Sequence, residues 1–158
     1  MEIDAFLADS AEALQGKIYA LGAGWSAIYA TAFPVTHPRV AVGVIIRVPY
    51  TATNQEHRVN LKLVDFDSNS IPLGLQVGPD GQPTPVHGIG AQFNVGRPPL
   101  LPAGDEQVVA LAMTIDGLQI PKPDMYTWVI EVDGDPMKRL PMRVQLLNQI
   151  GPNFGQQQ

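Results

Sequence analysis

Apolar and polar residues alternate along most of this chain, which is the pattern of β-strands that bury one face of a sheet. The alternation is clearest over 39–48, between Pro38 and Pro49. One face of that segment carries only branched apolar side chains, namely Val40, Val42, Val44, Ile46 and Val48. A second strand is predicted over 56–66, and we expect it to pair with the first. Burying a branched side chain contributes about 1.5–3 kcal/mol before entropy is subtracted, so these two strands should form the centre of the core.

Shorter alternating segments bring the predicted number of strands to about nine, with no long helix. The other strands are expected over 3–8, 17–24 with a continuation into 25–29, 73–77, 87–95, 105–116, 123–132 and 140–146. Residues 105–116 also fit the start of a helix, and the strand is favoured because a hairpin follows directly. Three segments are interpreted as connections: 10–16 with a helical turn capped by Ser10, a surface loop over 78–85, and an extended linker over 97–102.

The end of the alternating pattern predicts the last hairpin of an antiparallel β-sandwich. Residues 123–132 alternate after a proline-bounded turn, Asp133 and Gly134 form a tight turn, and 140–146 alternate again. Tyr126 is placed like a tyrosine corner, in which the hydroxyl binds the backbone a few residues upstream. We therefore predict an all-β fold, with a single β-sandwich domain over 1–148 and a polar C-terminal tail over 149–158.

Composition narrows the function classes. The chain has 158 residues and no cysteine, so we expect one domain that needs no disulfide and has no thiol chemistry. The net charge is −5, and the basic residues form no stripe of the kind that binds nucleic acid. No apolar run approaches the roughly 20 residues of a membrane span. Residues 1–4 are acidic where a secretory signal is basic, so a cytoplasmic location is expected.

Two groups of residues also resemble a known family. The segments 5–9 and 16–25, with a Gly16-Lys17 turn, are similar to the opening of a bacterial family of small uncharacterised proteins. Members of that family close with a Pro-x-x-Tyr strand and an Asp-Gly turn, as 123–134 does here. The resemblance spans residues 3–146. It implies an immunoglobulin-like β-sandwich of about 8–9 strands, and it brings no activity, cofactor or catalytic residue.

One turn is a candidate cation site. Asp65, Asp67 and Asn69 place oxygen-bearing side chains at alternate positions, as in the first half of a calcium loop. Ser70 stands where that loop needs glycine, and no glutamate stands at its twelfth position. A hairpin turn is therefore the favoured interpretation, and cation binding stays open.

The histidines are the other candidate chemistry. His37, His57 and His87 would bind zinc if the fold brought them together. His57 and His87 share the apolar register of their strands, whereas His37 precedes a proline in a loop. A histidine in the core or at a strand edge is the favoured interpretation of each. No serine lies in a Gly-x-Ser-x-Gly elbow, so no catalytic residue, metal or cofactor is predicted.

Five apolar residues are candidate protein contacts. Trp25, Tyr29 and Phe33 recur at four-residue spacing and would form an aromatic patch if exposed. Core filling is the favoured alternative for these three. Ile150 and Phe154 are the apolar anchors that the tail offers to a neighbouring subunit.

The leading functional hypothesis is a non-enzymatic β-sandwich that acts through protein contacts, as a homo-oligomer or a subunit of a larger assembly. A sandwich that binds a small ligand or carbohydrate through loops such as 78–85 is the alternative, favoured by an exposed aromatic beside polar groups in a pocket. A hydrolase is the third hypothesis, and it requires His57 or His87 within hydrogen-bond reach of a carboxylate.

Overall fold

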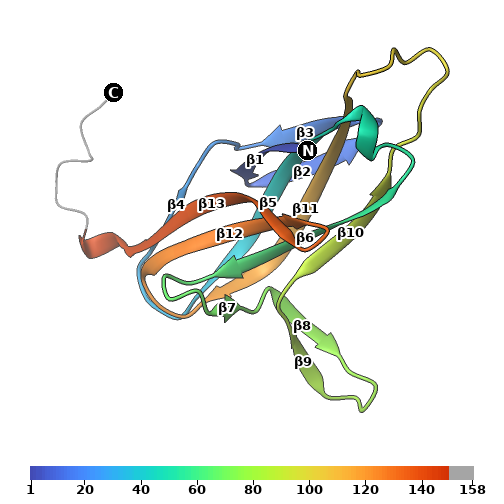
Figure 1. The fold of residues 1–158 in the computed structure, drawn as a ribbon. Coiled ribbons are helices and arrows are strands. Elements are labelled where there is room, and N and C mark those ends of the chain that lie inside the picture. The colour runs from blue at the N-terminus through green and yellow to red at the C-terminus, as the bar shows by residue number, and fades with distance from the viewer. Residues whose placement is uncertain (150–158) are drawn as a thin grey trace, which may run out of the picture.

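The computed structural model of the protein describes residues 1–149, and within them the chain is all-β apart from two short 3-10 helices. The strands follow one another as shown in Figure 1: β1 (Glu2–Ala8), β2 (Ser10–Leu14), β3 (Lys17–Leu21), β4 (Ala27–Ala30), β5 (Val35–Val48), β6 (Glu56–Val64), β7 (Ser70–Ile71), β8 (Gly74–Val77), β9 (Pro83–Val86), β10 (Ile89–Asn94), β11 (Gln107–Ile120), β12 (Asp124–Val132) and β13 (Asp135–Leu146). The 3-10 helices are η1 (Tyr50–Ala52) and η2 (Leu147–Gln149). No helix in this part of the chain is long and apolar enough to cross a membrane.

Three strands form the smaller of the two main sheets, in the order β1-β5-β11, and both pairings are antiparallel. The strand predicted over 39–48 is confirmed and begins earlier, at Val35. Its predicted apolar face is fully buried. The ambiguous segment 105–116 belongs to β11, so the strand prediction is confirmed there too.

The larger sheet has the order β10-β6-β12-β13-β4, with β7 also paired to β6. Its last pairing, β13 with β4, is parallel, and the other pairings are antiparallel. The predicted pairing of 39–48 with 56–66 is wrong, because β5 and β6 lie in different sheets. Alternation indicates which face of a strand is buried but not which strand supplies its hydrogen bonds. The two strands still share one core, since Val44 and Leu61 belong to the same buried cluster.

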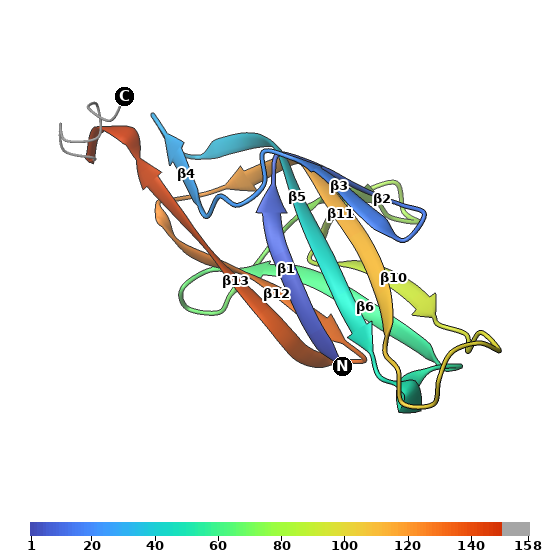
Figure 2. The same ribbon diagram turned by 90° about the horizontal axis from the view of Figure 1, so that it is seen from above.

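Seen from above, β1 and β5 of the smaller sheet lie over strands of the larger one (Figure 2). The predicted closing hairpin is confirmed as β12 and β13, joined at Asp133 and Gly134. Tyr126 is fully buried, and its hydroxyl donates to the carbonyl of Lys122 at 2.8 Å, which is the contact of a tyrosine corner. The indole N–H of Trp128 reaches the sulfur of Met142 at 3.4 Å across the same hairpin.

Two predictions near the N-terminus are wrong. The segment 10–16 is not a connection with a helical turn, because its first five residues are β2, which pairs with β3. Gln15 and Gly16 have φ angles of 52° and 73°, and two left-handed positions in a row make a tight hairpin turn. Strand β3 ends at Leu21, and the chain then crosses to the larger sheet to form β4, so 25–29 does not continue it.

The predicted number of about nine strands is too low, since residues 1–149 contain thirteen. The additional strands belong to short hairpins and to sheet edges, such as β7 and β9. An alternation of two to four residues is too short to be told from a loop in the sequence.

Candidate protein interface

The hairpin of β8 and β9 projects from the body of the molecule (Figure 1), and we call residues 74–86 the arm. In its register, Leu75 pairs with Pro85 and Val77 pairs with Pro83. Residues paired across antiparallel strands point to the same face, and so do alternate residues along one strand. These four side chains therefore form one apolar face. Leu75 is 72% exposed and Val77 is 78% exposed, so this face lies in water.

The other face of the arm is polar, with Gln76 opposite Thr84. Its tip is closed by the N–H of Gly78, which donates to the carbonyl of Gln82 at 2.8 Å. A hairpin of two strands is only marginally stable in water on its own. Covering the apolar face would therefore stabilise the arm.

The prediction of a loop over 78–85 is wrong in part, because β9 occupies its second half. Pro83 and Pro85 hide this strand from sequence analysis, since proline is rare in strands. Proline is accepted here because β9 pairs with β8 alone, on one side, and needs no N–H on the other.

A depression of about 380 Å³ lies where the arm joins the body. Leu75 and Pro85 of the arm line it, together with Asp116 and Gly117 of β11. Arg39 Nε donates to Asp116 Oδ1 at 2.6 Å, and this hydrogen bond lowers the pKa of the Asp116 carboxyl. The apolar face of the arm thus continues into a hollow at its base whose one carboxylate is already paired.

Charge is nearly absent from the part of the chain that holds the arm. Between Ser68 and Gly96 the only Asp, Glu, Lys or Arg is Asp80, although such residues make up 16% of the whole sequence. The same segment supplies β10, the outer strand of the larger sheet. Interface centres are depleted in charge relative to the rest of a protein surface. The lack of charge over 68–96, together with the closely spaced leucine, valine and proline residues, is the signal by which the sequence could have indicated the arm.

The predicted contact residues lie elsewhere. Tyr29 of β4 is 52% exposed, whereas Trp25 and Phe33 are half-buried and pack against the core. Trp25 and Tyr29 line a common depression, and Phe33 is not part of that lining. Ile150 and Phe154 fall outside the described residues, so their contacts stay predictions.

The depression beside Trp25 and Tyr29 measures about 240 Å³ and also includes Asp9 and His37. The rings of Trp25 and His37 lie 6.0 Å apart. Burial lowers the pKa of His37, although the charge of Asp9 opposes this, so the imidazole is neutral near pH 7. The indole N–H of Trp25 is buried without a hydrogen-bond acceptor in the described part of the chain. An exposed aromatic here stands beside polar groups, the arrangement that the ligand-binding alternative requires.

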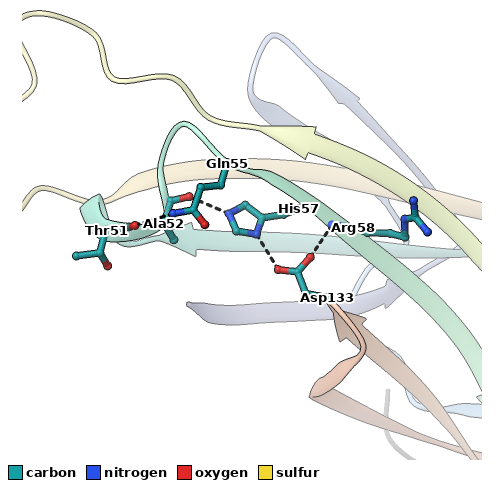
Figure 3. A network of polar contacts seen from close by, with 6 residues as sticks. All are labelled: Thr51, Ala52, Gln55, His57, Arg58 and Asp133. Atoms are coloured by element: carbon teal, nitrogen blue, oxygen red, sulfur yellow. Dashed lines mark hydrogen bonds and ion pairs between the residues drawn. The ribbon is translucent and has the colours of Figure 1, made fainter.

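His57 is buried, and both of its ring nitrogens are hydrogen bonded (Figure 3). Nδ1 lies 2.8 Å from Asp133 Oδ2, and Nε2 lies 2.8 Å from the carbonyl oxygen of Ala52. Since an ionised carboxylate and a carbonyl only accept hydrogen bonds, both nitrogens are placed to donate, which is the arrangement of an imidazolium. Burial lowers the pKa of His57, but the hydrogen bonds to Ala52 and Asp133 outweigh it and raise the pKa above 6.5.

Asp133 completes this network. Its Oδ1 accepts the backbone N–H of Arg58 at 2.9 Å, and the bonds from Arg58 and His57 lower the pKa of the Asp133 carboxyl. The charged pair ties β6 to the turn between β12 and β13. The hydrolase hypothesis requires this closeness of histidine and carboxylate, but an imidazolium whose two N–H groups are both engaged has no lone pair with which to accept a substrate proton. In this arrangement the pair acts as a structural tie.

The other candidate ligands are separate. His87 is exposed, and its Nδ1 lies 3.1 Å from the hydroxyl of Ser70. Among residues 1–149, no group of three His, Asp or Glu side chains is placed to hold a metal ion. Asp65 accepts the backbone N–H of Asn69 at 2.8 Å and its side-chain amide at 3.1 Å. These hydrogen bonds close a turn from Asp65 to Asn69, which is the interpretation that the sequence favours.

The model of a family of unknown function, DUF6941, covers residues 3–145. This is nearly the span of the resemblance found in the sequence. No curated protein matches the chain. Because the family description names no activity, ligand or partner, function has to be argued from the surface of the molecule.

Proposed function

This chain belongs to the family of unknown function DUF6941, and we propose that it is a non-catalytic β-sandwich that acts through protein–protein contacts. It works as a homo-oligomer or as a subunit of a larger assembly. The observation that carries the proposal is the arm, whose Leu75 and Val77 side chains are both exposed on one apolar face. Contiguous apolar surface of this kind marks an interaction site more often than isolated exposed residues do.

The chemistry around the arm supports the same function. A partner that covers the apolar face removes Leu75, Val77 and the two prolines from water, and the one charged residue of the arm, Asp80, lies in its turn. The prolines reduce the conformational freedom of β9 before binding, so less entropy is lost when a partner orders the arm. The depression at the base of the arm extends the apolar surface toward β11.

The finer assignment of architecture and setting belongs to the same proposal. We infer an immunoglobulin-like sandwich from the two sheets that share one core and from the corner at Tyr126. A bacterial origin agrees with the sequence resemblance, and the cytoplasmic location stays a prediction.

The arm is tested by adding charge to one face at a time. Leu75→Asp with Val77→Asp places two carboxylates on the apolar face. Gln76→Asp with Thr84→Asp places the same two charges on the polar face of the same hairpin and is the matched control. Light-scattering mass after gel filtration, over a series of protein concentrations, should fall for the first variant and equal that of the wild type for the second. Equal masses for both variants would count against the arm as a contact.

The predicted tail contacts are tested separately. A chain that ends at Asn148 lacks Ile150 and Phe154 but keeps the arm. If the tail holds a neighbouring subunit, this shorter chain has a lower mass than the full chain. An unchanged mass would remove Ile150 and Phe154 from the interface and leave the arm unaffected.

A second candidate function, binding of a small polar ligand such as a sugar, is favoured by the depression beside Trp25. Tyr29 offers an exposed ring there, and Asp9 and His37 offer polar groups. Titration with simple sugars should change the fluorescence of the protein, and Tyr29→Ala should weaken binding. The absence of any saturable change with the wild-type protein would exclude this function for the sugars used.

A further inference from the structure

Strand β10 is an edge of the larger sheet, and one of its sides pairs with no other strand of residues 1–149. It pairs with β6 along Ile89–Asn94, without a register shift, and is the last strand in the order of the sheet. Its residues alternate between half-buried and exposed. The exposed ones are Gly90, Gln92 and Asn94.

This edge lacks the devices that usually prevent strands from pairing with another chain. Such devices are charged side chains, prolines, bulges or a very short strand. Edge strand β1 carries Glu2 and Asp4, and edge strand β4 has four residues. By contrast, β10 has six residues and includes neither a charged residue nor a proline. Of these three edges it is therefore the one best suited to accept a further strand, and the fourth edge, β11, carries the charged Asp116.

The backbone groups that face outward on β10 can be identified. The carbonyl of Val95 accepts the N–H of Asn54 at 2.7 Å, on the side where β6 begins. Backbone groups alternate in direction along an extended strand. Those of Ala91 and Phe93 therefore point toward β6, and those of Gly90, Gln92 and Asn94 point away from the sheet.

We propose that the outer edge of β10 pairs with β10 of a second copy of this chain, antiparallel about a two-fold axis at Gln92. This inference rests on the proposed function, since it names a partner and a second surface for self-association. Two copies that each carry a net charge of −5 repel one another. Contact along a strand without charge brings no pair of like charges face to face.

The register follows from which groups face outward. Side chains of paired residues share a face, so the inner faces of both sheets stay continuous only if odd residues pair with odd and even with even. An axis at Gln92 pairs Gly90 with the partner's Asn94, and all three outward residues then exchange hydrogen bonds. An axis at Ala91 would leave the outward groups of Asn94 unpaired.

Side-chain shapes favour the same register. On the inner face, small Ala91 stands opposite the partner's large Phe93. On the outer face, a shallow depression of about 330 Å³ lies over Gly90 and is bordered by Arg58 and Gln92. The partner's Asn94 faces this depression and can enter it, with its amide oxygen toward the guanidinium of Arg58. The interface is isologous, so it closes at two copies.

The absence of cysteine in the chain allows a direct test of the register. Gln92→Cys would place the only two thiols of the dimer opposite each other. Paired Cα atoms lie about 5.5 Å apart, within the usual Cα separation of disulfides, about 4.4–6.8 Å. The matched control is Asn94→Cys on the same exposed face. Its two thiols would lie four positions apart along the strand, at roughly 14 Å.

Under mild oxidation, the Gln92→Cys protein should become a covalent dimer on a non-reducing gel while the Asn94→Cys protein stays monomeric. Equal cross-linking of both, or of neither, would overturn the proposal.

A second variant, Gln92→Lys, adds like charges across the axis and should halve the light-scattering mass of a dimer. Thr114→Lys, on an exposed position of β11, should leave the mass unchanged. The cross-linking is repeated in a protein that also carries Leu75→Asp and Val77→Asp. Cross-linking that persists there would show that the β10 contact does not depend on the arm, so each of the two proposals can be refuted independently.

Discussion

The smaller sheet and the segment from Ser68 to Gly96 present different surfaces to water. On the smaller sheet, exposed ion pairs link neighbouring strands: Arg39 lies 2.6 Å from Asp116, and Arg47 lies 2.8 Å from Asp4. Between Ser68 and Gly96, the arm and β10 together carry one charged side chain. The strands of the smaller sheet bury one face, whereas all four residues of β8 are exposed.

Our proposal assigns the contact surface to the region without charge and leaves the charged sheet in water. Exposed ion pairs contribute little to stability, but charged side chains at an edge prevent it from pairing with another chain. The charges on β1 therefore protect its edge. Strand β10 has no such protection, and the arm beside it adds exposed Leu75 and Val77. The uncharged region is thus suited to contact with protein.

The largest expected effect separates apolar residues of the core from those of the arm. Leu61 of β6 is fully buried, whereas Leu75 is 72% exposed. We expect Leu61→Ala to lower the free energy of unfolding by about 2–5 kcal/mol, through lost burial and a cavity. Leu75→Ala should change the stability of the monomer by less than about 0.5 kcal/mol. Urea denaturation at low protein concentration measures both, and a large loss for Leu75→Ala would mean that the arm is part of the core.

A smaller loss of stability is expected when the pair of His57 and Asp133, which lies beside β10, is broken. The imidazole of His57 lies 5.3 Å from the ring of Phe93 and is held by Asp133. Asp133→Asn removes the charge that this imidazolium faces, and a lost charged hydrogen bond of this kind costs about 1–2 kcal/mol once solvent exposure is allowed for. Urea denaturation near pH 5 measures this loss. Asp135→Asn, in the same turn and exposed, is the matched control.

The same pair gives a pH dependence with a definite sign. Because the folded-state pKa of His57 lies above 6.5, its contribution to stability is complete below pH 6.5 and is lost as the pH rises through the folded-state pKa. Wild type should therefore lose stability over that interval, and Asp133→Asn should lose less. A wild type whose stability rises through the same interval would contradict an imidazolium at His57.

The smallest effect belongs to the charged surface. Removing the exposed pair with Arg39→Ala or Asp116→Ala should leave the urea midpoint unchanged within error, because both side chains stay hydrated when the partner is lost. Their light-scattering mass should also equal that of the wild type. A change in mass would place an interface on the smaller sheet and reverse the comparison.

Long strands were predictable from the sequence because many apolar residues recur at every second position and so indicate the same buried face. The strand over 39–48, the strand within 105–116 and the hairpin closed by Asp133 and Gly134 are confirmed for this reason. Sheet membership was not predictable, as β5 and β6 illustrate. Both carry the same pattern, and the partner of a strand depends on tertiary contacts rather than on its own alternation.

The candidate surface was harder to predict than the fold. Pro83 and Pro85 suggested a loop, since proline strands are rare, although a strand paired on one side accepts them. The spacing of Trp25 and Tyr29 indicated a contact at residues that line another depression, away from the arm. The lack of charge over 68–96 was visible in the sequence, but it becomes meaningful only when the fold places the arm and an unpaired edge in the same segment.

The most direct test of the contact surface is hydrogen–deuterium exchange measured at low and at high protein concentration. If the uncharged region mediates self-association, backbone amides of the arm and of β10 exchange more slowly at high concentration, while those of β1 and β11 are unchanged. Exchange that does not depend on concentration, or protection that appears on β1 instead, would contradict the central claim that the charge-poor region is the contact surface.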